Sequence, residues 1–446
     1  MREMKDSGIE WIGEIPLEWE INKIKYMFSN GKGLPITKEN LIDEGLPVIS
    51  YGQIHSKDNN GTKIGKNLLR FVNEKYSMKY PQCSISENDF VFADTSEDYD
   101  GCGNCVLKRD NSKVFAGYHT IILHSLLKRD NRFLAYLFKT DIWRKQIREK
   151  ASGVKVFSIT QKTLMNCKVI LPGYNEEKII ANYLDTQCSE IDAIAEDIQK
   201  EISLLEDYKK SVITEVVTKG LNPDAEMKDS GIAWIGDIPK DWDLLKIGYV
   251  TKEISDIDHY MPSDSDDIDK VPYVMIGDLK ENISQIDFES CKYISKKVYR
   301  ALSIKSKPEK GNVIFARYAT IGTVCFVDSE KQLLVSYACL TVKANELIKG
   351  KFLFYYFKSN AFLEEVSQYV KSNTQGNIGK ESLIRAKIVV PKLKEQTQII
   401  SYLDSKCSEI DAIIADKKRQ RGILAEYKKS LIYEYVTGKK EVPINE

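Results

Sequence analysis

The chain has 446 residues with 65 Lys and Arg and 65 Asp and Glu, so its formal net charge is zero. Hydrophobic residues make up 42% of the sequence and charged residues 29%, a composition that supports packed cores and excludes a disordered chain. Because one hydrophobic core seldom extends beyond about 250–300 residues, we expect at least two domains. The longest apolar runs are strand-sized and the N-terminus is polar, so we expect no membrane segment, no signal peptide and a cytoplasmic location.

Two segments of the sequence occur twice. MKDSGIEWIGEIPLEWEINKI at residues 4–24 recurs as MKDSGIAWIGDIPKDWDLLKI at residues 227–247. YLDTQCSEIDAI…EDYKKS, which starts at Tyr183, recurs as YLDSKCSEIDAI…AEYKKS, which starts at Tyr402. In the stretches that lie between these repeated segments, the two halves are only faintly similar. A repeated frame around divergent interiors indicates two pseudo-symmetric halves that share an architecture and differ in what the interiors do.

The zero net charge hides a segregation of charge. Residues 22–175 contain 24 basic and 15 acidic side chains, and residues 245–394 contain 23 and 18. Residues 176–220 carry 11 acidic and only 5 basic side chains. Both interiors are therefore basic, as expected of surfaces that meet a polyanion.

In chain order we predict seven parts: a frame segment (1–21), a first variable domain (22–175), a long helix (176–220), a linker with the second frame segment (221–244), a second variable domain (245–394), a second long helix (395–439) and a tail (440–446). The fold class is α/β (α+β), with two pseudo-symmetric domains joined by two long antiparallel coiled-coil helices.

The two helices are predicted from apolar residues at spacings of three and four that follow strand-like runs ending in Pro172 and Pro391. Each helix would be roughly 60 Å long. Neither can bury its apolar seam alone, so we expect the two to pack together. The residues predicted to pack are Ile191, Ile194, Ile198, Leu205, Tyr208 and Val212 in the first helix, and Ile410, Ile413, Leu424, Tyr427 and Leu431 in the second. Antiparallel pairing would also place acidic Glu196, Asp197 and Glu201 near basic Lys417, Lys418, Arg419 and Arg421.

The sequence contains no motif for catalysis. It has neither a G-x-x-x-x-G-K-[ST] phosphate loop nor a G-x-G-x-x-G that opens a helix after a strand. Cys102 and Cys105 form a C-x-x-C that Cys83 and His119 could complete as zinc ligands, but the spacing fits no common zinc pattern. We predict no catalytic residue, no bound metal and no cofactor on this chain.

Three polar loops in each half have side chains suited to reading base edges and binding phosphates. They comprise residues 51–61, 94–104 and 152–162 in the first half, and residues 276–282, 317–323 and 371–380 in the second. The candidate DNA-binding residues are Tyr51, Gln53, His55, Lys57, Asp98, Tyr99, Lys155, Gln161, Lys162, Asp278, Lys280, Arg317, Tyr318, Thr320, Asn373, Thr374, Gln375, Asn377 and Lys380.

The repeated MKDSGI.WIG.IP..W, the passages LPGYNEEKIIANYLD and VPKLKEQTQIISYLD, and the EIDAI to YKKS helices resemble the specificity (S) subunit of type I restriction-modification systems over essentially the whole chain. The resemblance implies that each variable domain is a target recognition domain for one half of a bipartite site in double-stranded DNA. It implies that the helices set the gap between the half-sites and dock two methylation subunits, with restriction subunits in the full complex. S-adenosylmethionine, ATP and Mg would then belong to those partner subunits. The alternative is a coiled-coil protein–protein adaptor without sequence-specific DNA binding.

Overall fold

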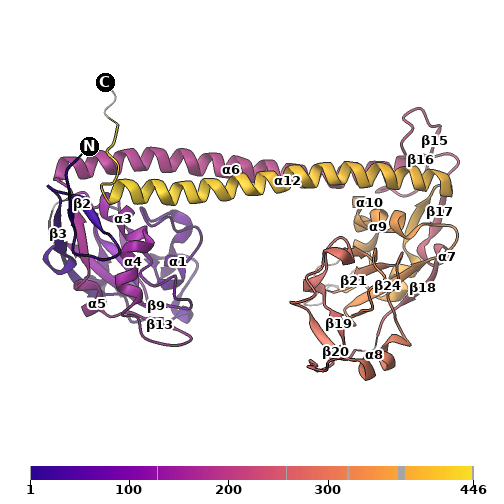
Figure 1. Cartoon of the computed structure of the whole chain (residues 1–446), viewed down its shortest axis with the longest axis horizontal. Coiled ribbons are helices and arrows are strands. Elements are labelled where there is room, and N and C mark those ends of the chain that lie inside the picture. The colour runs from indigo at the N-terminus through magenta and orange to yellow at the C-terminus, as the bar shows by residue number, and fades with distance from the viewer. Residues whose placement is uncertain (1, 128, 258, 319–321, 370–376, 444–446) are drawn as a thin grey trace. The chain divides into compact units, whose positions relative to one another are not determined.

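The computed structural model of the chain describes residues 2–127, 129–257, 259–318, 322–369 and 377–443 (Figure 1). It divides into two compact units. Unit 1 comprises Met1–Asp197 with Gln420–Glu446, and unit 2 comprises Ile198–Arg419. The division crosses both long helices, so each unit contains one basic interior, one frame segment and part of each helix. The boundaries that the sequence suggests for seven parts stay predictions.

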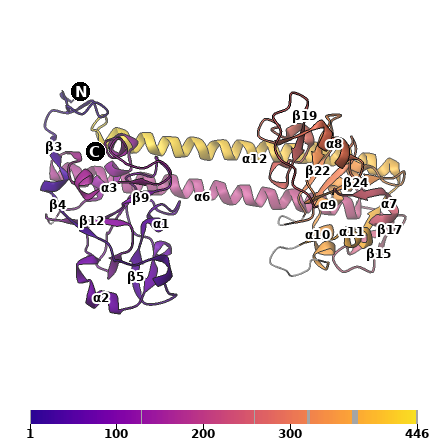
Figure 2. The same ribbon diagram turned by 90° about the horizontal axis from the view of Figure 1, so that it is seen from below.

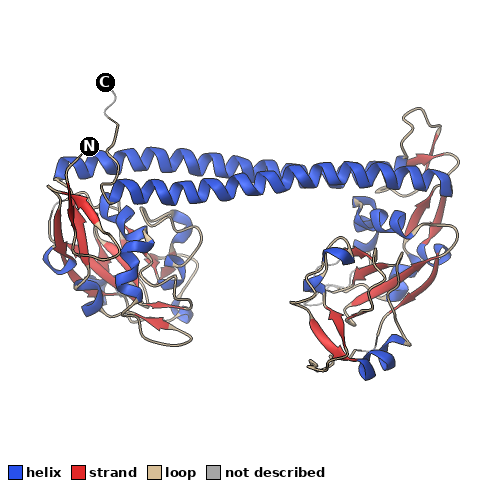
Figure 3. Ribbon diagram, in the orientation of Figure 1, coloured by secondary structure: helices blue, strands red, loops and turns tan. Residues whose placement is uncertain are grey.

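Unit 1 holds two four-stranded sheets, ordered β10-β8-β12-β4 and β6-β5-β11-β7, and three two-stranded pairs (Figure 3). The first sheet is antiparallel, and the second contains the parallel pair β5 and β11. The strands of unit 1 are β1 (Met4–Asp6), β2 (Glu14–Pro16), β3 (Glu20–Lys23), β4 (Phe28–Lys32), β5 (Leu46–Ile49), β6 (Arg70–Val72), β7 (Ser84–Ile85), β8 (Phe90–Ala93), β9 (Thr95–Ser96), β10 (Cys105–Leu107), β11 (Val114–Ala116), β12 (Thr120–Ser125), β13 (Phe157–Ser158) and β14 (Lys168–Leu171).

The helices of unit 1 include one whose central residues are all buried in the aromatic core. They are α1 (Tyr51–Ile54), α2 (Lys75–Lys79), α3 (Arg132–Lys139), α4 (Asp141–Arg148), α5 (Gln161–Met165) and the start of α6 (Tyr174–Lys219). All residues of α3 from Phe133 to Phe138 are buried, as expected of a helix enclosed on every side. The rings of Phe138 and Trp143 lie 4.1 Å apart and join α3 to α4.

Unit 2 repeats this plan with a β18-β24-β21-β22 sheet and a β20-β19-β23 sheet (Figure 2). Its strands are β15 (Met227–Asp229), β16 (Asp237–Pro239), β17 (Asp243–Lys246), β18 (Thr251–Ser255), β19 (Lys270–Val274), β20 (Lys292–Ser295), β21 (Val313–Ala316), β22 (Val324–Phe326), β23 (Leu334–Val335), β24 (Cys339–Ala344) and β25 (Lys387–Val390). Its helices are α7 (Ile247–Val250), α8 (Lys296–Ser303), α9 (Gly350–Lys358), α10 (Asn360–Ser367), α11 (Lys380–Arg385) and most of α12 (Leu393–Val436).

The repeated frame fastens the ends of the long helices. In unit 1 the Trp19 Nε1–H donates to Glu176 Oε2 in the first turn of α6 at 3.2 Å. In unit 2 the Trp242 Nε1–H donates to Glu395 Oε2 in the first turn of α12 at 2.9 Å. Gly220 ends α6 at a φ of +79°, and a Cβ there would lie 3.1 Å from the Trp242 ring. Each buried tryptophan therefore anchors the start of one long helix, and Trp242 also covers the end of the other.

The long helices are continuous over 46 residues in α6 and 44 residues in α12. Each follows a strand and a proline, as predicted, and at 1.5 Å per residue each is about 65–70 Å long. Inside unit 1 the Lys428 Nζ–H donates to Asp192 Oδ1 at 2.6 Å. Inside unit 2 the Lys209 Nζ–H donates to Asp411 Oδ2 at 2.7 Å. These contacts confirm antiparallel pairing within each unit, and Lys417 also pairs with Glu201 at 2.5 Å, as the charge pattern predicted.

The buried seam of the helices differs from the predicted one at four positions. Ile194, Tyr208, Ile413 and Tyr427 are 46–53% exposed. The seam instead contains Ala195, Lys209, Ile414 and Lys428, each one residue further along the chain; Lys209 and Ile414 are buried, and Ala195 and Lys428 are half-buried. Ile191, Ile198, Val212, Ile410 and Leu431 are buried, whereas Leu205 and Leu424 are half-buried.

The error has a physical cause. A hydrophobicity pattern favours isoleucine or tyrosine over the neighbouring alanine or lysine at three of these positions, and it cannot choose between the adjacent Ile413 and Ile414. Only positions 195, 209, 414 and 428 keep the strictly alternating three- and four-residue spacing. Lys209 lies in the seam because its long stem packs there while its ammonium reaches Asp411.

Truncation of the seam should destabilise the chain far more than truncation beside it. Ile202 is 1% exposed and Leu204 is 68% exposed. We expect Ile202→Ala to lower the free energy of unfolding by about 2–5 kcal/mol, because a buried cavity is left behind. The matched control Leu204→Ala should change it by less than about 0.5 kcal/mol. Urea denaturation followed by circular dichroism measures both, and equal losses would contradict the seam.

Candidate nucleic-acid interface

The three polar loops of the first half meet in unit 1, and we call residues 51–61, 94–104 and 152–162 the first loop cluster. The His55 Nε2–H donates to the Thr95 carbonyl at 2.8 Å, and Asn104 Nδ2–H donates to His55 Nδ1 at 3.0 Å. Strand β9 pairs with β13, which joins the second loop to the third. Loops that start at residues 51, 94 and 152 thus form one surface, and both ring nitrogens of His55 hydrogen-bond to the second loop.

Two candidates of the first loop make contacts within unit 1. Gln53 Oε1 accepts the Ser50 backbone N–H at 3.2 Å and closes the start of α1. The Tyr51 ring is half-buried, with its centroid 5.6 Å from Tyr118 and 5.4 Å from His119. Lys57 is exposed and available to a phosphate.

Among the remaining candidates of the first loop cluster, some have internal contacts and others are exposed. Asp98 accepts the Gly101 backbone N–H, and Tyr99 is 45% exposed with its ring 5.6 Å from Phe157. Gln161 Nε2–H donates to the Gly31 carbonyl at 2.9 Å and ties α5 to β4. Lys155 and Lys162 are exposed.

In unit 2 the second and third loops also meet. Tyr318 and Asn377 form an isolated antiparallel bridge, and the Ile378 N–H donates to the Arg317 carbonyl at 3.0 Å. The Arg317 guanidinium pairs with Asp256 and lies 5.2 Å from the Tyr318 ring centroid. The carboxylate and the ring together fix the orientation of this guanidinium.

The other candidates of unit 2 lie at loop ends or outside the described residues. Asp278 Oδ2 accepts the Met275 N–H at 2.9 Å, the same turn closure that Gln53 makes in unit 1. Lys280 is exposed, and Lys380 is exposed at the start of α11. Thr320, Asn373, Thr374 and Gln375 lie outside the described residues.

Arg317 is a candidate from the sequence alone, whereas its counterpart in unit 1, Asp94, was missed. The Asp94 N–H donates to the His119 carbonyl at 3.1 Å, and the Arg317 N–H donates to the Ala338 carbonyl at 3.0 Å. Asp94 and Arg317 each follow the last residue of the equivalent strands β8 and β21. The same backbone site therefore carries an acid in unit 1 and a base in unit 2. A positive φ of 54° at His119, whose Nδ1 lies 3.4 Å from Asp94 Oδ1, also had no signal in the sequence.

Residues 16–204 and 239–420 match the family described as type I restriction modification DNA specificity domain. The chain belongs to this family. It is 24% identical to the type I restriction enzyme MjaVIII specificity subunit of Methanocaldococcus jannaschii over 96% of this chain and 94% of that one. It is 26% identical to the putative MjaX specificity subunit of the same organism over 97% and 96%. A solved chain from a study of complex assembly and conformational transition of the type I R-M system has a TM-score of 0.66 at 16% identity, covering 96% of this chain and 99% of that one.

These comparisons confirm the predicted fold class and family. As a member of a specificity-subunit family, the chain supplies DNA sequence specificity and is not itself a catalytic subunit. The adaptor alternative is not favoured.

The cysteines that might have bound zinc are buried thiols. Cys83, Cys102 and Cys105 are all buried and free, and burial raises the pKa of Cys105 to about 12. Among the residues that the structure describes, no group of three or more His, Cys, Asp and Glu side chains is placed to hold a metal. Within the same residues, no helix combines the length and apolarity needed to cross a membrane.

Proposed function

We propose that each unit reads one half of a bipartite site in double-stranded DNA through its own loop cluster, and that the helix pair sets the unread gap. The observation that carries this proposal is the convergence of distant polar loops inside each unit, with different side chains at equivalent backbone sites. Asp94 in unit 1 and Arg317 in unit 2 prefer different base edges, because a carboxylate accepts from cytosine N4 whereas a guanidinium donates to guanine O6 and N7.

In the full complex, the catalytic chemistry belongs to partner subunits. We propose that two methylation subunits dock on the long helices and bind S-adenosylmethionine, and that restriction subunits with ATP and Mg join them in the full complex. The family membership and the solved type I assembly that this fold resembles support such partners.

The exposed lysines at the loop clusters predict a steep salt dependence of DNA binding. Lys57, Lys155, Lys162, Lys280 and Lys380 are all exposed. Each phosphate contact contributes about −0.9 to the slope of log K against log salt, so five contacts would weaken binding about 500-fold between about 50 and 200 mM salt. Fluorescence anisotropy with a labelled duplex measures this slope.

Single variants give that measurement its control. We expect Lys155→Ala to make the slope shallower by about 0.9, whereas Lys210→Ala, on the exposed side of α6, should leave it unchanged. A salt-insensitive affinity for DNA would favour the adaptor alternative instead.

A further inference from the structure

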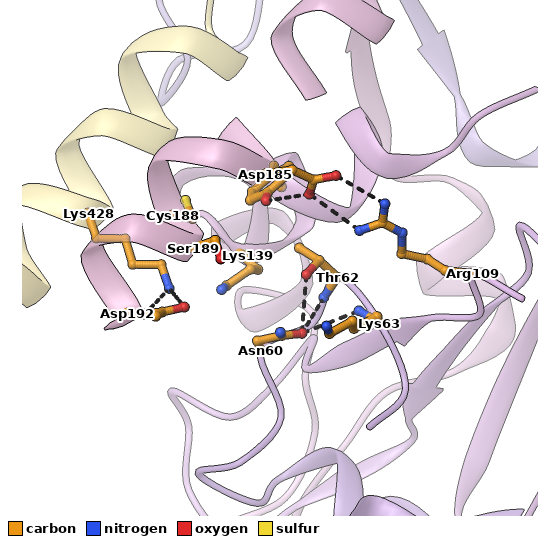
Figure 4. A pocket seen from close by; sticks show the side chains of 11 residues that line it. Asn60, Thr62, Lys63, Arg109, Lys139, Asp185, Cys188, Ser189, Asp192 and Lys428 are labelled. Atoms are coloured by element: carbon orange, nitrogen blue, oxygen red, sulfur yellow. Dashed lines mark hydrogen bonds and ion pairs between the residues drawn. The ribbon is translucent and has the colours of Figure 1, made fainter. Parts of the chain in front are cut away.

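Unit 1 contains a pocket, and at the equivalent place in unit 2 a side chain fills the space. The pocket encloses about 270 Å³ between the loop around Asn60, helix α3 and the paired helices α6 and α12 (Figure 4). Its lining residues are Asn60, Thr62, Lys63, Arg109, Tyr136, Lys139, Asp185, Cys188, Ser189, Asp192 and Lys428. Four of them are cationic and two are acidic, so the lining carries an excess of positive charge.

Both acids of the pocket are already engaged. Asp185 accepts from Arg109 Nη2 at 3.0 Å, from Arg132 Nη1 at 2.9 Å and from the Tyr136 hydroxyl at 2.8 Å. Asp192 accepts both of its bonds from Lys428. Within the described residues, the Lys139 ammonium has no hydrogen bond or ion pair, although it points into the pocket beside Lys428 and Asp192 (Figure 4).

Unit 2 shows what an equivalent lysine pair holds. Lys358 occupies the last position of α9, as Lys139 does in α3, and Lys209 pairs with Asp411 as Lys428 pairs with Asp192. There the Glu281 carboxylate bridges the two ammonium groups, because it accepts from Lys209 Nζ at 2.9 Å and pairs with Lys358.

The backbone identifies the residue of unit 1 that stands where Glu281 stands. The Phe326 N–H donates to the Glu281 carbonyl at 2.8 Å, and the Leu107 N–H donates to the Gly61 carbonyl at 3.1 Å. Phe326 and Leu107 end the equivalent strands β22 and β10. Gly61 therefore replaces the glutamate, and a Cβ built on it would lie 3.1 Å from Lys139 Cγ. Among the residues of unit 1 that the structure describes, the lysine pair is kept but no carboxylate bridges its two members.

We propose that this pocket binds a carboxylate between Lys139 and Lys428, at the place that the Glu281 carboxylate takes in unit 2. The group comes either from a free small carboxylic acid or from an acidic side chain of a bound methylation subunit, and the second source rests on the proposed function. Burial and the neighbouring Lys428 lower the pKa of Lys139 to about 8, because the Asp192 carboxylate nearby, which is bonded to Lys428, offsets them only in part.

Equilibrium dialysis of the full chain with labelled glutarate, at ionic strength matched with sodium chloride, tests the free acid. We expect one glutarate per chain, at least about tenfold weaker binding to Lys139→Met because a charge-assisted hydrogen bond is lost, and unchanged binding to the exposed-lysine control Lys150→Met. Glu281→Gly should open the equivalent pocket and raise the stoichiometry to two. If that variant fails to fold, the comparison of Lys139→Met with Lys150→Met decides alone.

The second measurement separates the two sources. If glutarate does not bind, a tenfold or greater loss of affinity for the methylation subunit in Lys139→Met, but not in Lys150→Met, assigns the carboxylate to that subunit. Glutarate binding that Lys139→Met leaves unchanged would overturn the proposal. The proposal would also be overturned if glutarate does not bind and Lys139→Met leaves the affinity for the methylation subunit unchanged. It would be overturned as well if the unaltered chain binds neither glutarate nor the methylation subunit.

Discussion

Exchanging residues 22–175 for the corresponding segment of another family member should replace one half of the methylated DNA sequence and leave the other half intact. The reason is that the contacts that shape the first loop cluster are internal to the exchanged segment. His55 binds Thr95 and Asn104, and β9 pairs with β13, all within residues 22–175. The Arg317 and Asn377 loops of unit 2 have contacts of their own.

The effect should be all-or-none at the level of the recognised half-site, since each mismatched base pair typically costs about 1–3 kcal/mol and several are changed at once. Sequencing that detects methylated bases, on DNA from cells that express the exchanged chain with the methylation subunit, gives the answer. The mirror exchange of residues 245–394 is the control and should alter the opposite half-site. A change in both half-sites after one exchange would contradict independent reading.

Lengthening both long helices by one heptad should widen the unread gap and preserve both half-sites. Duplicating residues 196–202 in α6 and the aligned residues 415–421 in α12 keeps the alternating three- and four-residue spacing of both seams. Each helix becomes about 10.5 Å longer, which corresponds to a gap longer by up to about three base pairs.

The control for this design duplicates the heptad in α6 alone. That change should abolish methylation, because Lys428 and Asp192 in unit 1 and Lys209 and Asp411 in unit 2 could no longer pair in one register. Methylation mapping measures the gap and the half-sites for both designs. An unchanged gap in the doubly lengthened chain, or altered half-sites, would show that the helices do not set the spacing.

The long helices were predictable because their signal is local and repeated. Apolar spacing, the preceding prolines and the duplicated segment all pointed to the same element, and α6 and α12 begin within two residues of the predicted starts. The seam itself was less predictable. Lys209 is buried and Lys428 half-buried, and both are held by partners on the other helix, Asp411 and Asp192, which no local pattern reveals.

The loop clusters were predictable as regions but not residue by residue. The polar loops predicted after strands β5, β8 and β21 do lie together within each unit, yet Gln53 and Asp278 use one oxygen each to close their own turns. The opposed pair Asp94 and Arg317 emerged only when the two units were compared strand by strand. The Gly61 site of unit 1 likewise gained meaning only from Glu281 in unit 2.

The most direct test of the central claim is a map of methylated bases in cells that contain this chain and its methylation subunit. The account predicts one split motif, with two short half-sites separated by an unread gap of fixed length. A stable complex that methylates a continuous motif, or that methylates DNA without sequence preference, would contradict the assignment of one half-site to each unit.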